Sequence, residues 1–246
     1  MDYRNKITVI TVCYNAADVI KQTIESVINQ TYQNIEYIII DGGSTDETLS
    51  IIRKYEHKIT KWISEPDKGI YDAMNKGIEM ASGEWLNFMN AGDVFASKDV
   101  LEKVFSYNYP DKIAFLYSDN YYKEKDGGLL LSHHDHKIPS ILHQSAIYRK
   151  DLHNRHGFYA VTPKIIISDF LFFCMIPAEK FKKVDTIISI NTTDGISGSS
   201  LWCGTQRLCA MVVFRKYTFK QMLIHYAAFR LKIAFPKIYS FLKKKL

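Results

Sequence analysis

Two short apolar runs, each closed by polar or glycine residues, constrain the fold of this chain more than any other feature. The first run is Ile7–Val12, and the second is Tyr37–Ile40, which Asp41 and a Gly-Gly-Ser-Thr-Asp segment follow. Bulky, β-branched runs of this length are typical of strands buried on both faces of a parallel sheet. Ligands of open α/β sheets bind at the carboxyl ends of such strands, so Asp41 is the first functional candidate.

Helical and strand-like patterns alternate after these runs. Helices are expected over 20–28, 49–55, 70–78 and 98–105, and strands over 59–64, 85–89, 113–117 and 129–131. Ser44 with Glu47 forms a capping-box signature, Ser97 is a candidate cap, and Gly83 can end a helix. With 246 residues and no internal repeat, the chain predicts one large α/β domain with a Rossmann-like, mostly parallel, mixed sheet flanked by helices.

Charge separates the C-terminal end from the rest of the chain. Ten of the 32 Lys and Arg residues follow Asp194, whereas none of the 26 acidic residues does. Apolar residues recur at helical spacing between Phe219 and Ile233, and Pro236 interrupts the pattern. Residues 201–246 are therefore expected to form a basic amphipathic helical tail that binds a membrane surface, or a helix packed on the domain with a solvated basic face. No nucleic-acid motif appears, so nucleic acid is not an expected partner.

The four cysteines, Cys13, Cys174, Cys203 and Cys209, lack metal-ligand spacing. They are expected to be small buried thiols in a reducing compartment. The N-terminal residues lead into a strand without a secretory signal, which favours a cytoplasmic protein.

Neither the glycine fingerprint of dinucleotide folds nor a GxxxxGK[ST] phosphate loop is present. Any phosphates must therefore be held in another way. A carboxylate at a strand end can accept from a base N–H or a ribose hydroxyl, and a second one, Asp93, can hold a divalent cation. Mg²⁺ is commonly bound by one or two protein carboxylates plus substrate phosphates.

Two segments carry a resemblance to a known family. They read TVITVCYNAADVIKQTIESVINQTYQNIEYIIIDGGSTDET and EPDKGIYDAMNKGIEMASGEWLNFMNAGD. The sequence resembles glycosyltransferase family 2, the inverting nucleotide-sugar transferases of GT-A fold, and within it the bacterial members that make polysaccharide or exopolysaccharide. The similarity covers about residues 5–95 and continues more weakly beyond them. It implies a catalytic domain over 1–200, with a nucleotide-sugar half over about 1–95 and an acceptor half over about 96–200.

The resemblance implies a set of donor-binding residues. The nucleotide-sugar site would comprise Val12, Tyr14, Asp41, Asp67, Lys68, Asp72, Asn75 and Ala91. The carboxylate of Asp41 would accept from a uracil ring, although an ordinary turn or cap aspartate is the alternative. Asp72 and Asn75 lie one helical turn apart, so they either bracket the donor sugar or brace the loop.

The metal motif departs from the family pattern. Where family members usually carry Asp-any-Asp, this chain has Asn90-Ala91-Gly92-Asp93, with one carboxylate. The resemblance implies that Asp93 binds Mg²⁺ or Mn²⁺, which would act as a Lewis acid on the departing diphosphate. The alternative is that Asp93 caps the loop that follows it.

An inverting displacement needs a general base on the face opposite the leaving group, and Asp169 is the candidate. An N-cap aspartate without a catalytic role is the alternative. His143 and Gln144 belong to the resemblance and are expected to line the acceptor or diphosphate site. The cluster His133–His136 is a poor zinc template and is expected to be a solvated loop.

Three functions remain open from the sequence. The first is a metal-dependent, inverting hexosyl- or other glycosyltransferase that moves one sugar, without processivity, from a UDP-sugar or similar nucleotide sugar to a polyprenyl-diphosphate-linked glycan. Such an enzyme would be peripheral on the inner face of the cytoplasmic membrane. The second is a nucleotide-sugar-binding module without turnover, and the third is a sugar nucleotidyltransferase.

Overall fold

The fold is a mixed α/β sheet flanked by helices, seen in a computed structural model that describes residues 5–124, 126–136, 141–192 and 201–234. Seven strands form the main sheet in the order β10-β6-β9-β4-β1-β2-β3. Their bounds are β1 Ile7–Cys13, β2 Ile35–Asp41, β3 Lys61–Ser64, β4 Trp85–Phe88, β6 Phe115–Tyr117, β9 Ala146–Arg149 and β10 Phe181–Lys183. Only β9 runs antiparallel to its neighbours in this sheet, so the predicted mostly parallel sheet is confirmed.

Strand register brings the first candidate residues to one edge of the sheet. β1 is buried along its whole length, as its β-branched composition predicts. Cys13 pairs with Asp41 across β1 and β2, and Asp41 pairs with Ser64 across β2 and β3. These three residues therefore end neighbouring parallel strands side by side.

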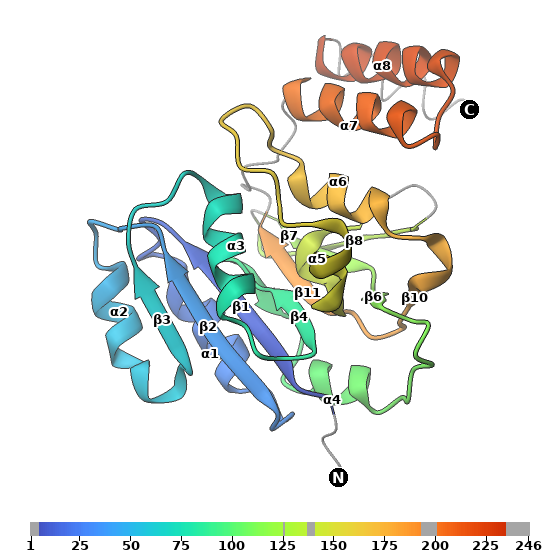
Figure 1. Ribbon diagram of the computed structural model, residues 1–246. Coiled ribbons are helices and arrows are strands. Elements are labelled where there is room, and N and C mark those ends of the chain that lie inside the picture. Colours follow the sequence, from blue (N-terminus) through green and yellow to red (C-terminus); the bar gives the residue numbers. More distant parts are fainter. Residues whose placement is uncertain (1–4, 125, 137–140, 193–200, 235–246) are drawn as a thin grey trace.

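Helices cover both faces of the sheet (Figure 1). One face packs against α1 (Ile20–Ile28), α2 (Thr48–Lys54) and α4 (Val100–Phe105). The other packs against α3 (Ile70–Met80), α5 (Asp151–His156) and α6 (Ser168–Met175). Ile7 and Val9 of β1 face the first core and Ile10 and Val12 the second, which is the alternation that a doubly covered strand requires. Short 3-10 turns lie at Glu56–Lys58, His143–Ser145 and Ala178–Lys180.

A smaller sheet lies beside the main one, with the order β5-β11-β7-β8. Its strands are β5 Val94–Phe95, β7 Asn120–Lys123, β8 Leu129–Ser132 and β11 Ser189–Thr192. β5 begins directly after Asp93, and β11 pairs with it in antiparallel register. The predicted metal residue thus lies where the two sheets meet.

Two C-terminal helices, α7 (Leu201–Val213) and α8 (Phe219–Ala234), follow the sheet domain. Cys203, Ala210 and Met211 of α7 form a small core with residues in and just before α6. α8 lies close against α7, because a Cβ on Gly204 would meet the ring of Phe229. Phe219, Leu223 and Ile224 of α8 are exposed, so its apolar residues do not all face the protein. No helix among the described residues has the length and apolar character of a membrane span. Pro236 lies outside them.

Four local expectations are wrong. α2 begins after Glu47 rather than at a capping box on Ser44, whose hydroxyl bonds to Asp41. α4 begins after Asp99, not at a Ser97 cap. α3 ends at Met80 with Ala81 as its C-cap, and position 83 requires glycine because it lies close against the backbone of β1. Three cysteines are buried, but Cys209 is exposed.

Candidate active site

Asp41 is the centre of a saturated hydrogen-bond cluster at the end of β2. Its side chain is 0% exposed. One carboxylate oxygen accepts from the backbone N–H groups of Gly43 (3.0 Å) and Ser44 (2.9 Å) and from the Ser64 hydroxyl (2.7 Å). The other accepts from the Ser44 hydroxyl and the Cys13 thiol. Burial raises the pKa of Asp41, but the bonds from Ser44 and Ser64 outweigh it, so the pKa lies below its ordinary value and the group is anionic.

These contacts shape the loop that follows β2. A carboxylate offers about four lone-pair sites, and five donors already converge on Asp41. A direct bond from Asp41 to a base would require one of these donors to move, so the contact with uracil stays a prediction. The arrangement itself gives Asp41 a clear structural task, which is to fix the Gly42–Ser44 backbone.

Tyr14 and Asp67 meet at Gly42. A Cβ on Gly42 would lie 2.4 Å from an Asp67 carboxylate oxygen and 3.5 Å from the Tyr14 ring. The Tyr14 side chain is 61% exposed, so its ring face is open to a ligand. Val12 is buried behind it, and its carbonyl accepts from the N–H of Ala91. The structure therefore brings four of the predicted donor-site residues to one strand edge.

The segment between β3 and α3 is held by two carboxylates. Asp67 accepts from the N–H of Gly69 (2.8 Å), and Asp72 accepts from the N–H of Lys68 (3.0 Å). The Lys68 side chain is left exposed. Asn75 uses both ends of its amide on the backbone of Tyr159, accepting at 3.0 Å and donating at 2.9 Å. Asp72 and Asn75 thus hold loop backbone, and a contact of either with the donor sugar stays a prediction.

Asp93 is buried and contacts segments far away in sequence. Its carboxylate accepts from the side-chain amide of Gln144 (2.7 Å) and from the backbone N–H of Thr192 (3.1 Å). Burial raises its pKa to about 6, against the opposing effect of these bonds. The Oδ1 atom of Asn90, three residues earlier, is buried without a hydrogen-bond partner.

These groups fit a divalent cation. A carboxylate oxygen and an unpaired amide oxygen are hard ligands of the kind that Mg²⁺ and Mn²⁺ prefer, and substrate phosphates can complete such a shell. No cluster of three or more His, Cys, Asp or Glu ligands occurs in the described ranges.

Asp169 lies in the first turn of α6 and accepts a 2.7 Å hydrogen bond from the Tyr71 hydroxyl of α3. The two residues are 98 positions apart in sequence. The N-cap of α6 is Ile167, so the N-cap alternative for Asp169 is wrong. Ser168, which stands where the family usually has Glu, accepts from the N–H of Ala160. Burial and the neighbouring Asp169 charge raise the pKa of Tyr71, which keeps its hydroxyl a donor.

His143 and Gln144 have different placements. The His143 ring is 3% exposed and packs among Phe88, Tyr148, Tyr159 and Phe173. Burial lowers its pKa to about 4, so the ring is neutral. The expectation that His143 lines a ligand site is therefore replaced by a core position behind the site, whereas Gln144 reaches Asp93.

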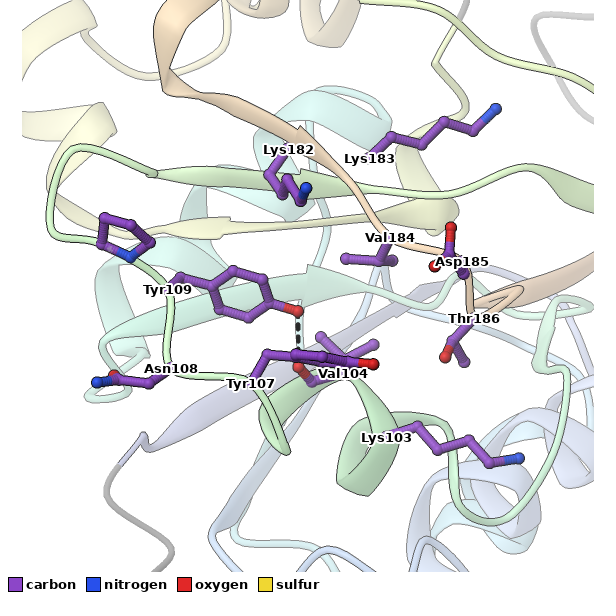
Figure 2. A pocket seen from close by; sticks show the side chains of 11 residues that line it. Lys103, Val104, Tyr107, Asn108, Tyr109, Lys182, Lys183, Val184, Asp185 and Thr186 are labelled. Carbon is purple, nitrogen blue, oxygen red and sulfur yellow. Dashed lines mark hydrogen bonds between the residues drawn. The ribbon is translucent and has the colours of Figure 1, made fainter.

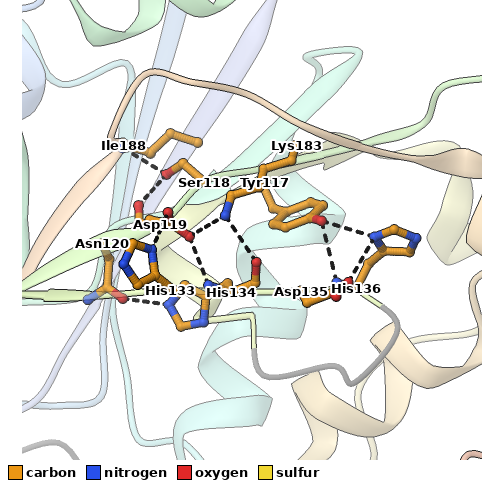
Figure 3. A network of polar contacts seen from close by, with 10 residues as sticks. All are labelled: Tyr117, Ser118, Asp119, Asn120, His133, His134, Asp135, His136, Lys183 and Ile188. Atoms are coloured by element: carbon orange, nitrogen blue, oxygen red, sulfur yellow. Dashed lines mark hydrogen bonds and ion pairs between the residues drawn. The ribbon is translucent and has the colours of Figure 1, made fainter.

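The histidine cluster takes part in a network of polar contacts (Figure 3). His133 pairs with Asp119 (2.8 Å), His134 with Asn120 (2.6 Å), and His136 with the Tyr117 hydroxyl (3.0 Å). Lys183 adds an ion pair to Asp119 at 2.6 Å. The expected solvated loop agrees with His133 and Asp135, which are exposed, and is wrong for His134, which is buried against Asn120.

A cavity lies apart from the predicted donor, metal and base residues. It has a volume of about 330 Å³ and is lined by the end of α4, the segment 107–110 and residues 182–186 (Figure 2). Tyr109 closes one side by donating to the Val104 carbonyl. None of the predicted site residues lines this cavity.

Sequence reasoning missed three residues of the site. Tyr71, Ser64 and Thr192 contact Asp169, Asp41 and Asp93, respectively. Tyr71 directly precedes Asp72 in the segment that carries the family resemblance, which was an available signal. No sequence signal marks Ser64 or Thr192, because their contacts depend on strand register.

Comparisons with known proteins agree with this architecture. A family model described as "Glycosyl transferase family 2" matches residues 8–170. An uncharacterized glycosyltransferase of Mycobacterium tuberculosis is 44% identical over 96 residues, which span 39% of this chain and only 37% of that relative. A PGL/p-HBAD biosynthesis glycosyltransferase of Mycobacterium bovis is 29% identical over 195 residues, covering 75% and 76% of the two chains.

A further relative in Escherichia coli is WfaP, described as a UDP-Glc:alpha-D-GlcNAc-diphosphoundecaprenol beta-1,3-glucosyltransferase. It is 36% identical over 121 residues, or 49% of this chain and 47% of WfaP. Among solved structures, S. aureus TarS in complex with UDP superposes with a TM-score of 0.67 at 17% identity, covering 94% and 72% of the two chains. Mannosyltransferase PcManGT of Pyrobaculum calidifontis, in complex with GDP-Man and Mn²⁺, gives 0.68 at 16% identity, covering 94% and 71%. These likenesses confirm the fold.

Proposed function

Because this chain belongs to glycosyl transferase family 2, we propose that it transfers a single sugar, with inversion, from a nucleoside-diphosphate sugar to a lipid-linked glycan. The observation that carries this proposal is the hydrogen bond between Tyr71 and Asp169. This bond joins Asp169, the candidate base, to α3, the helix that follows the segment with Asp67 and Lys68.

The donor would bind at the carboxyl edge of β1 to β3. The open Tyr14 ring suits stacking on a nucleobase, and the Asp67 carboxylate at Gly42 suits a base N–H or a ribose hydroxyl. Asp41 would keep the loop between them in one conformation. UDP is the proposed nucleotide, supported by the name of WfaP and by the TarS complex.

Asp93 and Asn90 would hold Mg²⁺ or Mn²⁺ together with the donor diphosphate. When bound, such an ion supplies Lewis-acid stabilisation of the departing nucleoside diphosphate. Gln144 and Thr192 fix the orientation of the Asp93 carboxylate, which limits the motion of the site. PcManGT, whose complex contains Mn²⁺, supports a divalent cation here.

Asp169 would act as the general base. It takes the proton of the acceptor hydroxyl while that oxygen bonds to the anomeric carbon and the bond from this carbon to the donor phosphate oxygen breaks. Tyr71 occupies one carboxylate oxygen, which leaves the other to receive the proton. Attack from the face opposite the diphosphate inverts the anomeric configuration.

The proposed acceptor is a glycan on a polyprenyl diphosphate, as the name of WfaP describes for that enzyme. Such a lipid lies in the cytoplasmic membrane, so we place the protein peripherally on its inner face. The described part of the C-terminal helices supports this location, since 201–234 contain several cations and no acidic residue.

The test is nucleoside diphosphate release from a panel of nucleotide sugars, with Mn²⁺ and a polyprenyl-diphosphate-linked N-acetylglucosamine acceptor. We expect acceptor-dependent release that Asp169→Asn reduces by about 100-fold or more, the usual contribution of a general base, with donor affinity unchanged. Asp111→Asn, which changes an exposed carboxylate, is the matched control. Donor binding without release, or release that Asp169→Asn leaves intact, would instead support a binding module, and diphosphate release from nucleoside triphosphates a nucleotidyltransferase.

A further inference from the structure

An apolar groove between α6 and α7 takes no part in the chemistry proposed above. It has a volume of about 270 Å³ and is lined mainly by Ile165, Ile167, Leu171, Ala210, Val213 and Phe214. Val213 is 75% exposed, so the groove is open to the outside. Ile167 of the groove is the N-cap residue of α6, the helix whose first turn carries Asp169.

α7 is seated against this region by specific polar contacts. The indole N–H of Trp202 donates to the Lys164 carbonyl at 2.9 Å, and the Gln206 side chain accepts from the N–H of Ile166 at 3.2 Å. Both contacts join α7 to the segment that leads into α6. The groove is therefore a built feature of the fold.

Arg207 lies on the side of α7 that faces α6. Within the described part of the chain it makes no hydrogen bond or ion pair, and its Nε atom is buried without a partner. Its guanidinium lies 5.2 Å from the ring centre of Phe170, the residue after Asp169. Tyr122 is within electrostatic reach of both Arg207 and Asp93. A partly buried cation without a partner is costly, and an anionic ligand would relieve that cost.

We propose that this groove binds the isoprenoid chain of the lipid-linked acceptor, with Arg207 contacting its diphosphate. This inference rests on the proposed function, since it assigns the lipid of that same acceptor. Arg207 packs on Phe170, which shares a small core with Ile167 and Ala210 of the groove, so a cation lies close to the apolar lining, as an amphiphilic anion requires. Charge complementarity supports this occupant, because α7, α8 and their connection carry only positive charges.

Short soluble probes test the assignment without a glycan or a donor. Binding of farnesyl diphosphate, farnesol and inorganic diphosphate would be measured by calorimetry on the full chain. We expect farnesyl diphosphate to bind more tightly than either fragment. Arg207→Gln should weaken it by about 10- to 100-fold, the range for lost charge-assisted hydrogen bonds, and Arg207→Lys should restore part of the loss. Arg53→Gln on α2, an exposed arginine, should change nothing.

Val213→Glu places a charge in the groove and should weaken farnesol and farnesyl diphosphate alike, whereas Leu130→Glu at an exposed site of β8 should not. The inference fails if inorganic diphosphate binds as well as farnesyl diphosphate, or if Arg207→Gln weakens UDP binding equally, which would assign Arg207 to the donor. It also fails if Val213→Glu alters only self-association in sedimentation, which would make the groove a contact between copies. Nucleoside diphosphate release is measured in a separate assay, so the proposed function and the lipid-binding inference can fail independently of each other.

Discussion

Glu36 is a charged side chain of β2 that is only 3% exposed. It accepts from the Thr8 hydroxyl (2.6 Å) and from both the N–H and the hydroxyl of Ser82 (2.7 Å each). Lys6 and Lys61 lie 3.8 Å away. Burial alone would raise the pKa of Glu36, but these bonds and the Lys6 charge lower it from 4.5 to about 2. One carboxylate thus ties β1, β2 and the loop after α3 together.

This lowered pKa predicts acid sensitivity. The folded state binds the proton of Glu36 less readily than the unfolded state, so its stabilisation is complete above pH 4.5 and is lost as the pH falls toward 2. The full contribution is about 3 kcal/mol at 1.36 kcal/mol per pKa unit. In urea titrations, Glu36→Gln should be less stable than wild type at pH 7, and the gap should narrow by pH 3. A gap that stays constant with pH would contradict this account; exposed Glu79→Gln is the control.

Tyr71 gives a second prediction at the scale of one residue. Its hydroxyl donates a 2.7 Å hydrogen bond to the Asp169 carboxylate. Tyr71→Phe removes that bond while the ring still packs on Tyr159. We expect kcat to fall by about 10-fold, since a neutral-to-charged hydrogen bond contributes about 1.5–3 kcal/mol, with the KM for the donor nearly unchanged. A rise in donor KM with constant kcat would show instead that Tyr71 serves binding.

The loop after β2 allows an experiment that separates ligand binding from stability. In Gly42→Ala the new Cβ would lie 2.4 Å from the end of the Asp67 side chain, which can swing away at little cost to folding. Asp67 would then leave its place beside Tyr14. We expect the melting temperature to stay within about 2 °C, because the close contact falls on the far end of a flexible side chain and not on backbone, and UDP affinity to fall several-fold in calorimetry.

Gly128→Ala is the matched control for Gly42→Ala, since its Cβ would also meet a flexible acidic side chain, that of Asp126, but in the β7–β8 hairpin. UDP should bind this variant as it binds wild type. Equal UDP affinities in all three proteins would mean that the position of Asp67 does not matter for the nucleotide.

Elements that depend on local pattern could be predicted from the sequence, and contacts that depend on register could not. The β-branched run of β1 and the helical spacing of α1 and α3 suffice for strand and helix. Ser44 looks like a cap locally, but its hydroxyl is used by Asp41 once β2 is in place. Likewise the burial of His143 follows from four aromatic rings that come together only in the folded sheet.

At the scale of the whole molecule, the two halves of the chain share one sheet. β9 of the second half pairs with β4 of the first, and β6 and β10 continue the sheet outward. The Gln144 contact to Asp93 and the Tyr71 contact to Asp169 cross the same boundary. The two halves are therefore one structural unit, which explains how residues about 50 to 100 positions apart come into contact.

The C-terminal helices carry the last prediction, which concerns the membrane. Lys216, Lys220 and Arg230 are exposed, and Leu223 and Ile224 are exposed beside them on α8. A surface of this composition should bind vesicles that contain phosphatidylglycerol and not vesicles of phosphatidylcholine alone. Each cation near an anionic surface contributes about 1 kcal/mol. Changing all three to Gln should therefore lower the affinity for these vesicles, measured by co-sedimentation, by about 100-fold or more.

The matched control changes Arg53, Lys54 and Lys58 to Gln, which removes three exposed cations from α2 and the 3-10 turn that follows it. It should leave vesicle binding nearly intact, because charges outside a Debye length of about 8 Å from the lipid are screened at physiological salt. If both triple variants lose binding equally, net charge and not the C-terminal surface governs attachment. If neither does, the exposed apolar residues of α8 act without electrostatic help, and raising the salt concentration should then leave vesicle binding unchanged.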